Sequence, residues 1–321
     1  MSKDAAMSDR RRRRTAAAVV LAAAVTALVP TLANAATPAA RTAAPILNGT
    51  RGNGLTISNG TRNVVMNGTV VRFGSDVRDL AWNPSGTKAA YIDSWGDLET
   101  ANANGTDRNI VAIPPRGVVF FAPTWQVTDV SDVQTHEPAL DNLIFTAGRD
   151  SGDGGSTWLE SISANVHFGR PTVLSLWPYV GHAPLPQTGN AWPSAGGSSY
   201  NAIFAYQNVN GEVYIHDDYL RAQGGAIGEG ESPAVSPDGD EVAFVRSVAG
   251  HDHIFVEDLT GNGGTRDITP SAKADFEQPT WSADGNTIAF ESSTGGIDTV
   301  SRTGGAVTRV SGYEGLPAYR G

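Results

Sequence analysis

A repeated strand–turn–strand unit constrains the fold of this chain more than any other feature of its sequence. Each clear copy has a short apolar segment, a turn that ends in glycine, and a second apolar segment. The three clearest copies are Leu80–Gly86 with Lys88–Ile92, Pro233–Gly239 with Glu241–Val245, and Pro279–Gly285 with Thr287–Phe290. In such turns glycine accepts a positive φ, and aspartate or serine hydrogen-bonds the turn backbone. The repetition predicts an array of similar sheets.

The spacing of the copies indicates how large each sheet is. Equivalent anchor residues at positions 82, 125, 192, 235 and 281 are separated by 43, 67, 43 and 46 residues. A propeller blade of four strands needs about 40–45 residues. The long step therefore predicts one blade plus an insertion of roughly 24 residues on that period, divided between 127–141 and 170–189. Third and fourth strands are expected after the repeated pair, for example at Gly296–Val300 and Val307–Val310.

The two ends of the chain indicate how the array closes. Leu316–Tyr319 repeats the pattern of a first strand, after which the chain ends. Residues 54–73 form a meander that lacks such a strand and turns at Asn59-Gly60 and Asn67-Gly68, which are strong hairpin signals. We predict an all-β, six-bladed β-propeller in which the C-terminal strand completes the N-terminal blade. The alternative is an open β array with a frayed C-terminus.

The first 35 residues have the organisation of a secretory signal peptide. Arg10–Arg14 form a basic region, Thr15–Val29 form an apolar region, and Ala33–Ala35 match a cleavage site. The apolar region is shorter than the roughly 20 residues that span a bilayer, so a retained membrane anchor is the less favoured alternative. We expect a signal peptide at 1–35, an N-terminal extension at 36–53 and a single propeller domain at 54–321, secreted by either the Sec or the twin-arginine route.

Charge and cysteine content limit the possible partners. The leader carries a net charge of +4, so its removal takes the chain from −10 to −14. A surface this acidic repels nucleic acid and anionic lipid, so we expect no nucleic-acid partner and no membrane insertion after leader cleavage. The chain has no cysteine, which excludes disulfides and thiol chemistry. The mature protein is expected to be an extracytoplasmic monomer.

The segments Ser236-Pro237-Asp238-Gly239 and Trp281-Ser282-Ala283-Asp284-Gly285, each followed by a short apolar strand, resemble the TolB-type WD-like propeller repeat. Members of this group share a fold and differ in function. They include envelope scaffolds that bind a peptidoglycan-associated lipoprotein, propellers that gate serine peptidases, and some polysaccharide lyases. The resemblance implies the fold but transfers no site, because the matching residues are turn and core positions.

Catalytic and cofactor motifs are not evident in the sequence. The chain has no Gly-x-Ser-x-Gly nucleophile elbow, no phosphate-binding Gly-Lys-Ser/Thr motif and no His-Glu-x-x-His motif, and no cofactor is expected. His251 and His253 would share one face of a strand and could bind a metal, although a solvated loop is the favoured interpretation there and at His216. Asp150–Gly155 could bind calcium or form a plain hairpin turn. Metal binding is therefore left open.

The second part of the insertion is the most individual segment of the chain. Trp177, Tyr179 and His182 lie in a proline-rich stretch and are predicted to contact a partner; alternatively, the aromatic residues fold back over the channel or a blade edge. The leading hypothesis is a secreted scaffold that binds a protein or a cell-wall ligand near the central channel. One alternative is an extracellular polysaccharide lyase or hydrolase that uses the channel, with His136, His182 and His251 converging. A third is a calcium-dependent, lactonase-like propeller with an acidic cluster on its axis.

Overall fold

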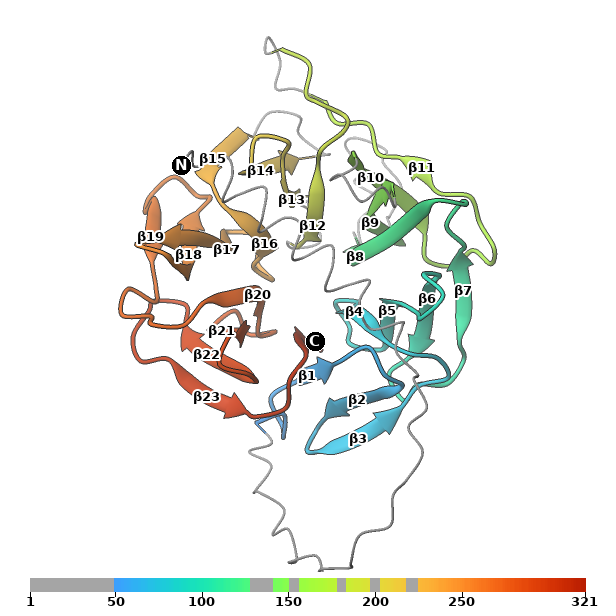
Figure 1. The fold of residues 1–321 in the computed structure, drawn as a ribbon, viewed down its shortest axis with the longest axis horizontal. Helices are drawn as coiled ribbons and strands as arrows, with labels where there is room; N and C mark the ends of the chain where they lie inside the picture. The colour runs from blue at the N-terminus through green and yellow to red at the C-terminus, as the bar shows by residue number, and fades with distance from the viewer. Residues whose placement is uncertain (1–48, 128–140, 150–155, 178–182, 197–202, 218–224) are drawn as a thin grey trace, which may run out of the picture.

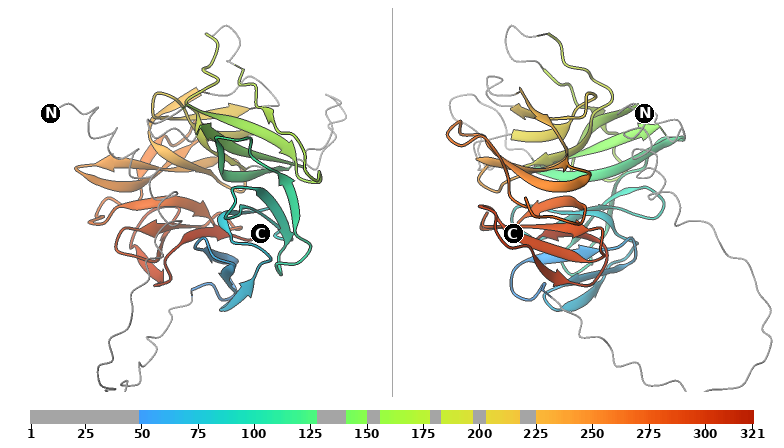
Figure 2. Two further views of the ribbon diagram at one scale, coloured as in Figure 1. Left: turned by 45° about the vertical axis from the view of Figure 1, so that its right-hand side comes forward. Right: turned by 60° about the vertical axis from the view of Figure 1, so that its left-hand side comes forward.

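The chain folds into six antiparallel sheets arranged around a central axis (Figure 1). The computed structural model describes residues 49–127, 141–149, 156–177, 183–196, 203–217 and 225–321. These residues contain strands and no helix, so none of them forms a helix long and apolar enough to span a bilayer. Views inclined to the axis show the blades as successive stacked layers of strands around the ring (Figure 2). The predicted six-bladed all-β propeller is confirmed.

Each blade consists of four strands, with the innermost strand given first here. Blade 1 is β24 (Leu316–Tyr319), β1 (Leu55–Ser58), β2 (Asn63–Met66) and β3 (Thr69–Arg72); blade 2 is β4 (Arg78–Trp82), β5 (Lys88–Ile92), β6 (Leu98–Asn102) and β7 (Asn109–Ala112); blade 3 is β8 (Val118–Val127), β9 (Asp141–Arg149), β10 (Thr157–Ser163) and β11 (Thr172–Val173). Blade 4 is β12 (Ala191–Ala195), β13 (Ile203–Gln207), β14 (Glu212–Asp217) and β15 (Gly225–Glu229); blade 5 is β16 (Glu231–Val235), β17 (Glu241–Val248), β18 (His251–Asp258) and β19 (Thr265–Asp267); blade 6 is β20 (Phe276–Trp281), β21 (Thr287–Ser292), β22 (Ile297–Ser301) and β23 (Thr308–Ser311).

The ring closes as the sequence predicts. Strand β24 pairs antiparallel with β1, with Leu55 opposite Tyr319 and Ser58 opposite Leu316. The buried Thr56 hydroxyl donates to the Ala318 carbonyl at 2.8 Å. Arg320 then reaches blade 2, where its Nε donates to the Gly86 carbonyl at 2.5 Å. The last residues of the chain therefore join the first blade to the second.

The inner strands share a bulge that the repeat pattern does not reveal. In blades 2–6 the register with the second strand shifts near the start of the inner strand. One residue of each bulge has a φ between 49° and 58°: Asp79, Ala122, Trp192, Ser232 and Gln278. All of these residues except Asp79 precede a proline. A bulge accepts a proline because the regular hydrogen-bond ladder between the strands is interrupted there.

Buried tryptophans connect neighbouring blades. The indole N–H of Trp82 donates to the Thr56 hydroxyl at 2.9 Å, that of Trp125 to the Ala81 carbonyl at 3.1 Å, and that of Trp281 to the Ala234 carbonyl at 2.8 Å. Each of these indole N–H groups therefore bonds to the blade that precedes its own in the chain. The tryptophans of the repeat are therefore structural, as the sequence analysis concludes for its motif residues.

Trp192 is an exception, and its alignment with these tryptophans is wrong. Ala195, which lies opposite Phe204, occupies the position that Trp82 holds opposite Ala89. Trp192 instead occupies the bulge position of Asp79. The sequence shows an Ala-Trp-Pro run that resembles the other anchors, whereas the bulge displaces the tryptophan three residues toward the start of the strand.

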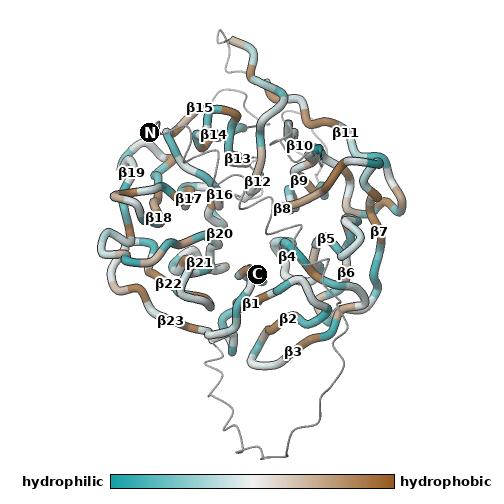
Figure 3. The backbone as a smooth tube through the Cα atoms, in the orientation of Figure 1, coloured by the Kyte–Doolittle hydropathy of each residue, from teal (hydrophilic) through white to brown (hydrophobic). Residues whose placement is uncertain are grey.

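The core is distributed around the ring. Apolar residues occur along the strands of every blade (Figure 3), and the buried clusters lie within and between neighbouring blades. One cluster, for example, joins Phe244 of blade 5 to Val213 of blade 4. This arrangement leaves the axis of the ring free for a channel.

Antiparallel strands give the ring two distinct faces. We call the face that carries the turns between second and third strands the upper face, and the face that carries the turns between first and second strands the lower face. Because Arg78 lies opposite Ile92, the bulge of β4 and the turn that follows β5 lie toward the same, upper, face.

Candidate functional site

A channel of about 330 Å³ runs along the axis between the inner strands. All six inner strands line it, mainly with alanine, proline, tryptophan and small polar residues. Among the lining residues that the structure describes, Asp79 has the one acidic side chain, and none is a histidine, lysine or arginine. The side chains that line the channel are therefore largely uncharged, with a single acidic one.

Asp79 lies at the upper end of this channel. Its Oδ2 accepts the N–H of Ala122 in the next blade at 3.1 Å. Burial raises the pKa of Asp79, while the Ala122 N–H and the charge of Arg78 act in the opposite direction. A carboxylate in such a poorly solvated position favours a cationic or hydrogen-bond-donating ligand over water.

Trp192 lies at the same level of the channel in blade 4. Its φ of +58° places a bulky side chain in the left-handed region, where such residues are uncommon. The backbone N–H of Trp192 donates to the Thr146 hydroxyl at 3.0 Å, and the indole ring lies edge-on to Phe121 with 5.2 Å between the centroids. Trp192 is half-buried and is one of the residues that line the channel.

The histidines of blade 5 do not form the metal pair considered from the sequence. Both lie in β18, where the ring of His251 contacts Asp275 at 3.3 Å and that of His253 contacts Asp267 at 2.8 Å. His253 is 5% exposed, so the solvated-loop interpretation is wrong for it, because β18 begins two residues earlier than the pattern indicates.

His216 is buried as well, which contradicts the expectation that it is solvated at the end of a third strand. It lies in β14 beside Phe204, with 4.8 Å between ring centroids, and its Nε2 accepts the N–H of Trp177 at 3.3 Å. The third strand of blade 4 extends two residues further than the sequence pattern suggests, and the ring is enclosed between blade 4 and the segment before it.

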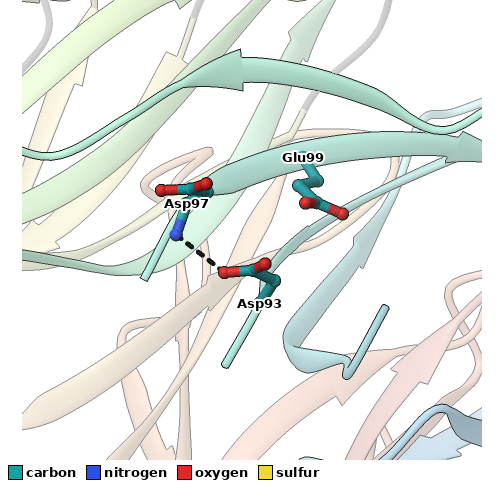
Figure 4. A group of neighbouring side chains, drawn as sticks. All are labelled: Asp93, Asp97 and Glu99. Carbon is teal, nitrogen blue, oxygen red and sulfur yellow. Dashed lines mark hydrogen bonds between the residues drawn. The ribbon is translucent and has the colours of Figure 1, made fainter. Parts of the chain in front are cut away.

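An acidic cluster lies in blade 2, away from the channel-lining residues (Figure 4). The carboxylates of Asp93, Asp97 and Glu99 all lie within 4.8 Å of one another. Arg108 forms a bidentate ion pair with the fully buried Glu99 and lies 3.9 Å from Asp93. The guanidinium thus supplies the positive charge that a metal ion would supply there. The acidic cluster on the axis that the lactonase-like hypothesis requires does not occur among the described residues.

Trp177 lies beside β14, the third strand of blade 4, where its backbone N–H donates to His216. The segment between β11 and β12 extends outward from the ring (Figure 1). The residue before Trp177 is held in place, because the Leu176 side chain is buried against Phe204 and Tyr206. The backbone N–H and carbonyl of Leu176 both bond to the Gln187 amide at 3.0 Å. Trp177 itself is 55% exposed. It therefore does not cover the channel.

Other predicted site residues lie outside the described residues: Tyr179, His182, His136 and the Asp150–Gly155 loop. The convergence of His136, His182 and His251 stays a prediction for that reason. Two residues that sequence reasoning did not select are Asp79 and Trp95, which is 86% exposed. A comparison of equivalent positions among the blades could have identified both, because neither residue type recurs there.

Comparison with known proteins supports the fold. No protein-family profile matches the chain. Its structure is similar to TolB from Acinetobacter baumannii, with a TM-score of 0.58, 14% identity, and coverage of 85% of this chain and 69% of that one. The fold is that of a TolB-type propeller. A putative TolB from Agrobacterium tumefaciens (TM-score 0.52, 16% identity, 81% and 90% coverage) and a chain of a nidogen/laminin complex (TM-score 0.52, 8% identity, 83% and 97% coverage) are also similar. The predicted resemblance is confirmed as a likeness of fold.

Proposed function

We propose that this chain is a secreted, monomeric scaffold that binds a protein partner at the upper mouth of its channel. One observation carries this proposal: a channel lined by largely uncharged side chains holds a single acidic one, the desolvated Asp79, at the same end as the half-buried Trp192. Acid–base catalysis requires groups that can exchange protons with a substrate, and usually more than one of them. One carboxylate with an aromatic neighbour suits recognition better.

The partner is expected to present a lysine or arginine side chain. A cation at the mouth could pair with Asp79 and contact the face of Trp192. The net charge of −14 without the leader would also speed the approach of a cationic partner. The nidogen/laminin complex gives a precedent of this fold within a protein assembly.

Trp177 is proposed as a second contact, together with Tyr179 and His182. An exposed tryptophan on a fixed base loses little conformational entropy on binding, which makes it an efficient anchor. Because Trp177 lies beside β14, the third strand of blade 4, a partner seated on the channel would have to extend outward over blade 4 to reach it.

The test is capture of partners from the culture and envelope fractions of the source, using immobilised wild-type protein and matched variants. Asp79→Asn and Trp192→Ala are expected to lower capture of the same partner about tenfold, and capture should weaken at high salt. Asp107→Asn, which removes an exposed carboxylate from a lower-face turn, is the control and should behave as wild type. Equal capture by all four proteins would refute a role for the channel mouth.

A further inference from the structure

The turn between β5 and β6 presents an isolated tryptophan on the upper face. Trp95 is 86% exposed, the largest value among the large apolar side chains that the structure describes. Exposure on this scale is costly for an indole, which buries a large apolar surface in most proteins.

The turn holds Trp95 rigidly. The buried Asp93 carboxylate accepts the N–H of Trp95 at 2.8 Å and that of Asp97 at 2.9 Å through the same oxygen. Backbone bonds from Asp93 N to the Asp97 carbonyl and from Gly96 N to the Asp93 carbonyl complete the turn. The backbone that carries the indole is therefore set before any ligand arrives, which lowers the entropy lost on binding.

Two other blades show that this turn does not need an aromatic residue. Blade 4 has the same backbone bonds between Asn208, Gly211 and Glu212, and blade 6 has them between Ser292, Gly295 and Gly296. The position of Trp95 is occupied there by Asn210 and by Thr294. Since asparagine and threonine satisfy the same geometry, the tryptophan is not required for folding of the turn.

The surroundings of Trp95 indicate what it binds. A protein anchor usually fills a pocket within a wide patch, whereas this indole stands on a turn whose neighbouring residues are Ser94, Gly96 and Asp97. Pro114 of the adjacent loop lies beside Gly96. An open indole face carries negative charge density that attracts the C–H bonds on the flat face of a sugar ring. Hydroxyl groups of the sugar could then bond to the Asp97 carboxylate of the same turn.

The acidic cluster behind the turn restricts the sugar further. Asp93, Asp97 and Glu99 lie close together, and Arg108 is bonded to Glu99. An acidic sugar would be repelled by the carboxylates, so a neutral one fits better. We propose that Trp95 is the stacking platform of a binding site for a neutral polysaccharide, separate from the channel mouth.

Affinity electrophoresis tests this site with defined probes. The wild-type protein is expected to be retarded in gels that contain glycol chitin or hydroxyethyl cellulose, and not in gels with polygalacturonate. Trp95→Thr, which installs the residue of blade 6, is expected to weaken retardation about tenfold, and Trp95→Tyr to retain most of it. Trp177→Ala and Asp79→Asn are controls that should migrate as wild type, so that failure here is separable from failure of the protein-binding proposal.

Two results would overturn the proposal. One is migration of the wild type through both neutral gels without retardation. The other is equal retardation of wild type and Trp95→Thr. If Trp95→Thr instead abolishes capture of a protein partner while neither gel retards the wild type, the turn is a protein contact and the polysaccharide assignment is wrong. Equal melting temperatures for wild type and Trp95→Thr would show that folding is unchanged.

Discussion

Replacement of Glu291 by glutamine should make the protein more stable at alkaline pH and leave it unchanged in acid. Glu291 of β21 lies directly opposite Glu277 of β20, and Glu314 lies on the segment that leads into the closing strand β24. Burial, together with the charges of Glu277 and Glu314, raises the pKa of Glu291 from 4.5 to about 7. The folded protein thus holds this proton more tightly than the unfolded chain does.

The sign and size of the effect follow from that difference. Below pH 4.5 the Glu291 carboxyl is protonated in both the folded and the unfolded protein, so it takes nothing from the free energy of unfolding. As the pH rises to 7 the unfolded chain has already lost the proton, so the free energy of unfolding falls, and above pH 7 the loss is constant. At about 1.4 kcal/mol per pH unit the loss would reach about 3.5 kcal/mol, and partial exposure of the side chain reduces it to roughly 1–2 kcal/mol.

Thermal unfolding at two pH values measures this prediction. Glu291→Gln should raise the melting temperature by about 2–6 °C at pH 8 and by less than about 1 °C at pH 4. Asp107→Asn, which neutralises an exposed carboxylate in a turn, is the matched control and should show no such contrast. An equal gain at both pH values would refute the electrostatic reasoning, since packing or hydrogen bonding would then explain it.

Three further perturbations test the ring and the acidic cluster. Trp281→Phe should lower the free energy of unfolding by about 1–3 kcal/mol, because the buried Ala234 carbonyl loses its donor; chemical denaturation measures this, and a change below about 0.5 kcal/mol would contradict the role of the indole bond. Deletion of residues 316–321 should abolish the cooperative transition and cause aggregation, because β1 becomes an exposed edge; size-exclusion chromatography of a monomer with the wild-type melting temperature would show that closure is dispensable. A chelator should shift the melting temperature by less than about 1 °C, because Arg108 already supplies a cation to the Asp93–Glu99 cluster through its ion pair with Glu99; a clear fall in a calorimetric scan would show that a bound metal contributes to stability.

The sequence predicted the fold because its strongest signals are local. The Ser282-Ala283-Asp284-Gly285 turn is specified within the turn itself, where the Asp284 carboxylate accepts the Ser282 hydroxyl at 2.6 Å and the Asn286 N–H at 3.1 Å. These bonds lower the pKa of Asp284 to about 2. A feature made by consecutive residues can be identified without coordinates, and its repetition then gives the number of blades.

The candidate site was harder to predict because it depends on neighbours distant in sequence. The burial of His253 depends on Asp267 of the next strand and on two extra residues of β18. The accessibility of Trp192 depends on a bulge that moves it away from the positions of Trp82 and Trp281. Register shifts of this kind leave the alternation of apolar residues almost intact, so periodicity does not detect them.

Departures from the repeat are the best guide to function in a ring of this kind. The Asp93 turn recurs in blades 4 and 6, and the Asp79 bulge recurs in blades 3–6, so any side chain that satisfies those geometries would preserve the fold. Neither geometry requires the tryptophan side chain of Trp95 or Trp192, and the backbone at Trp192 is strained by its side chain. Both lie toward the upper face, as does Asp79. A polysaccharide on Trp95 and a protein at the channel mouth would therefore approach the molecule from the same side.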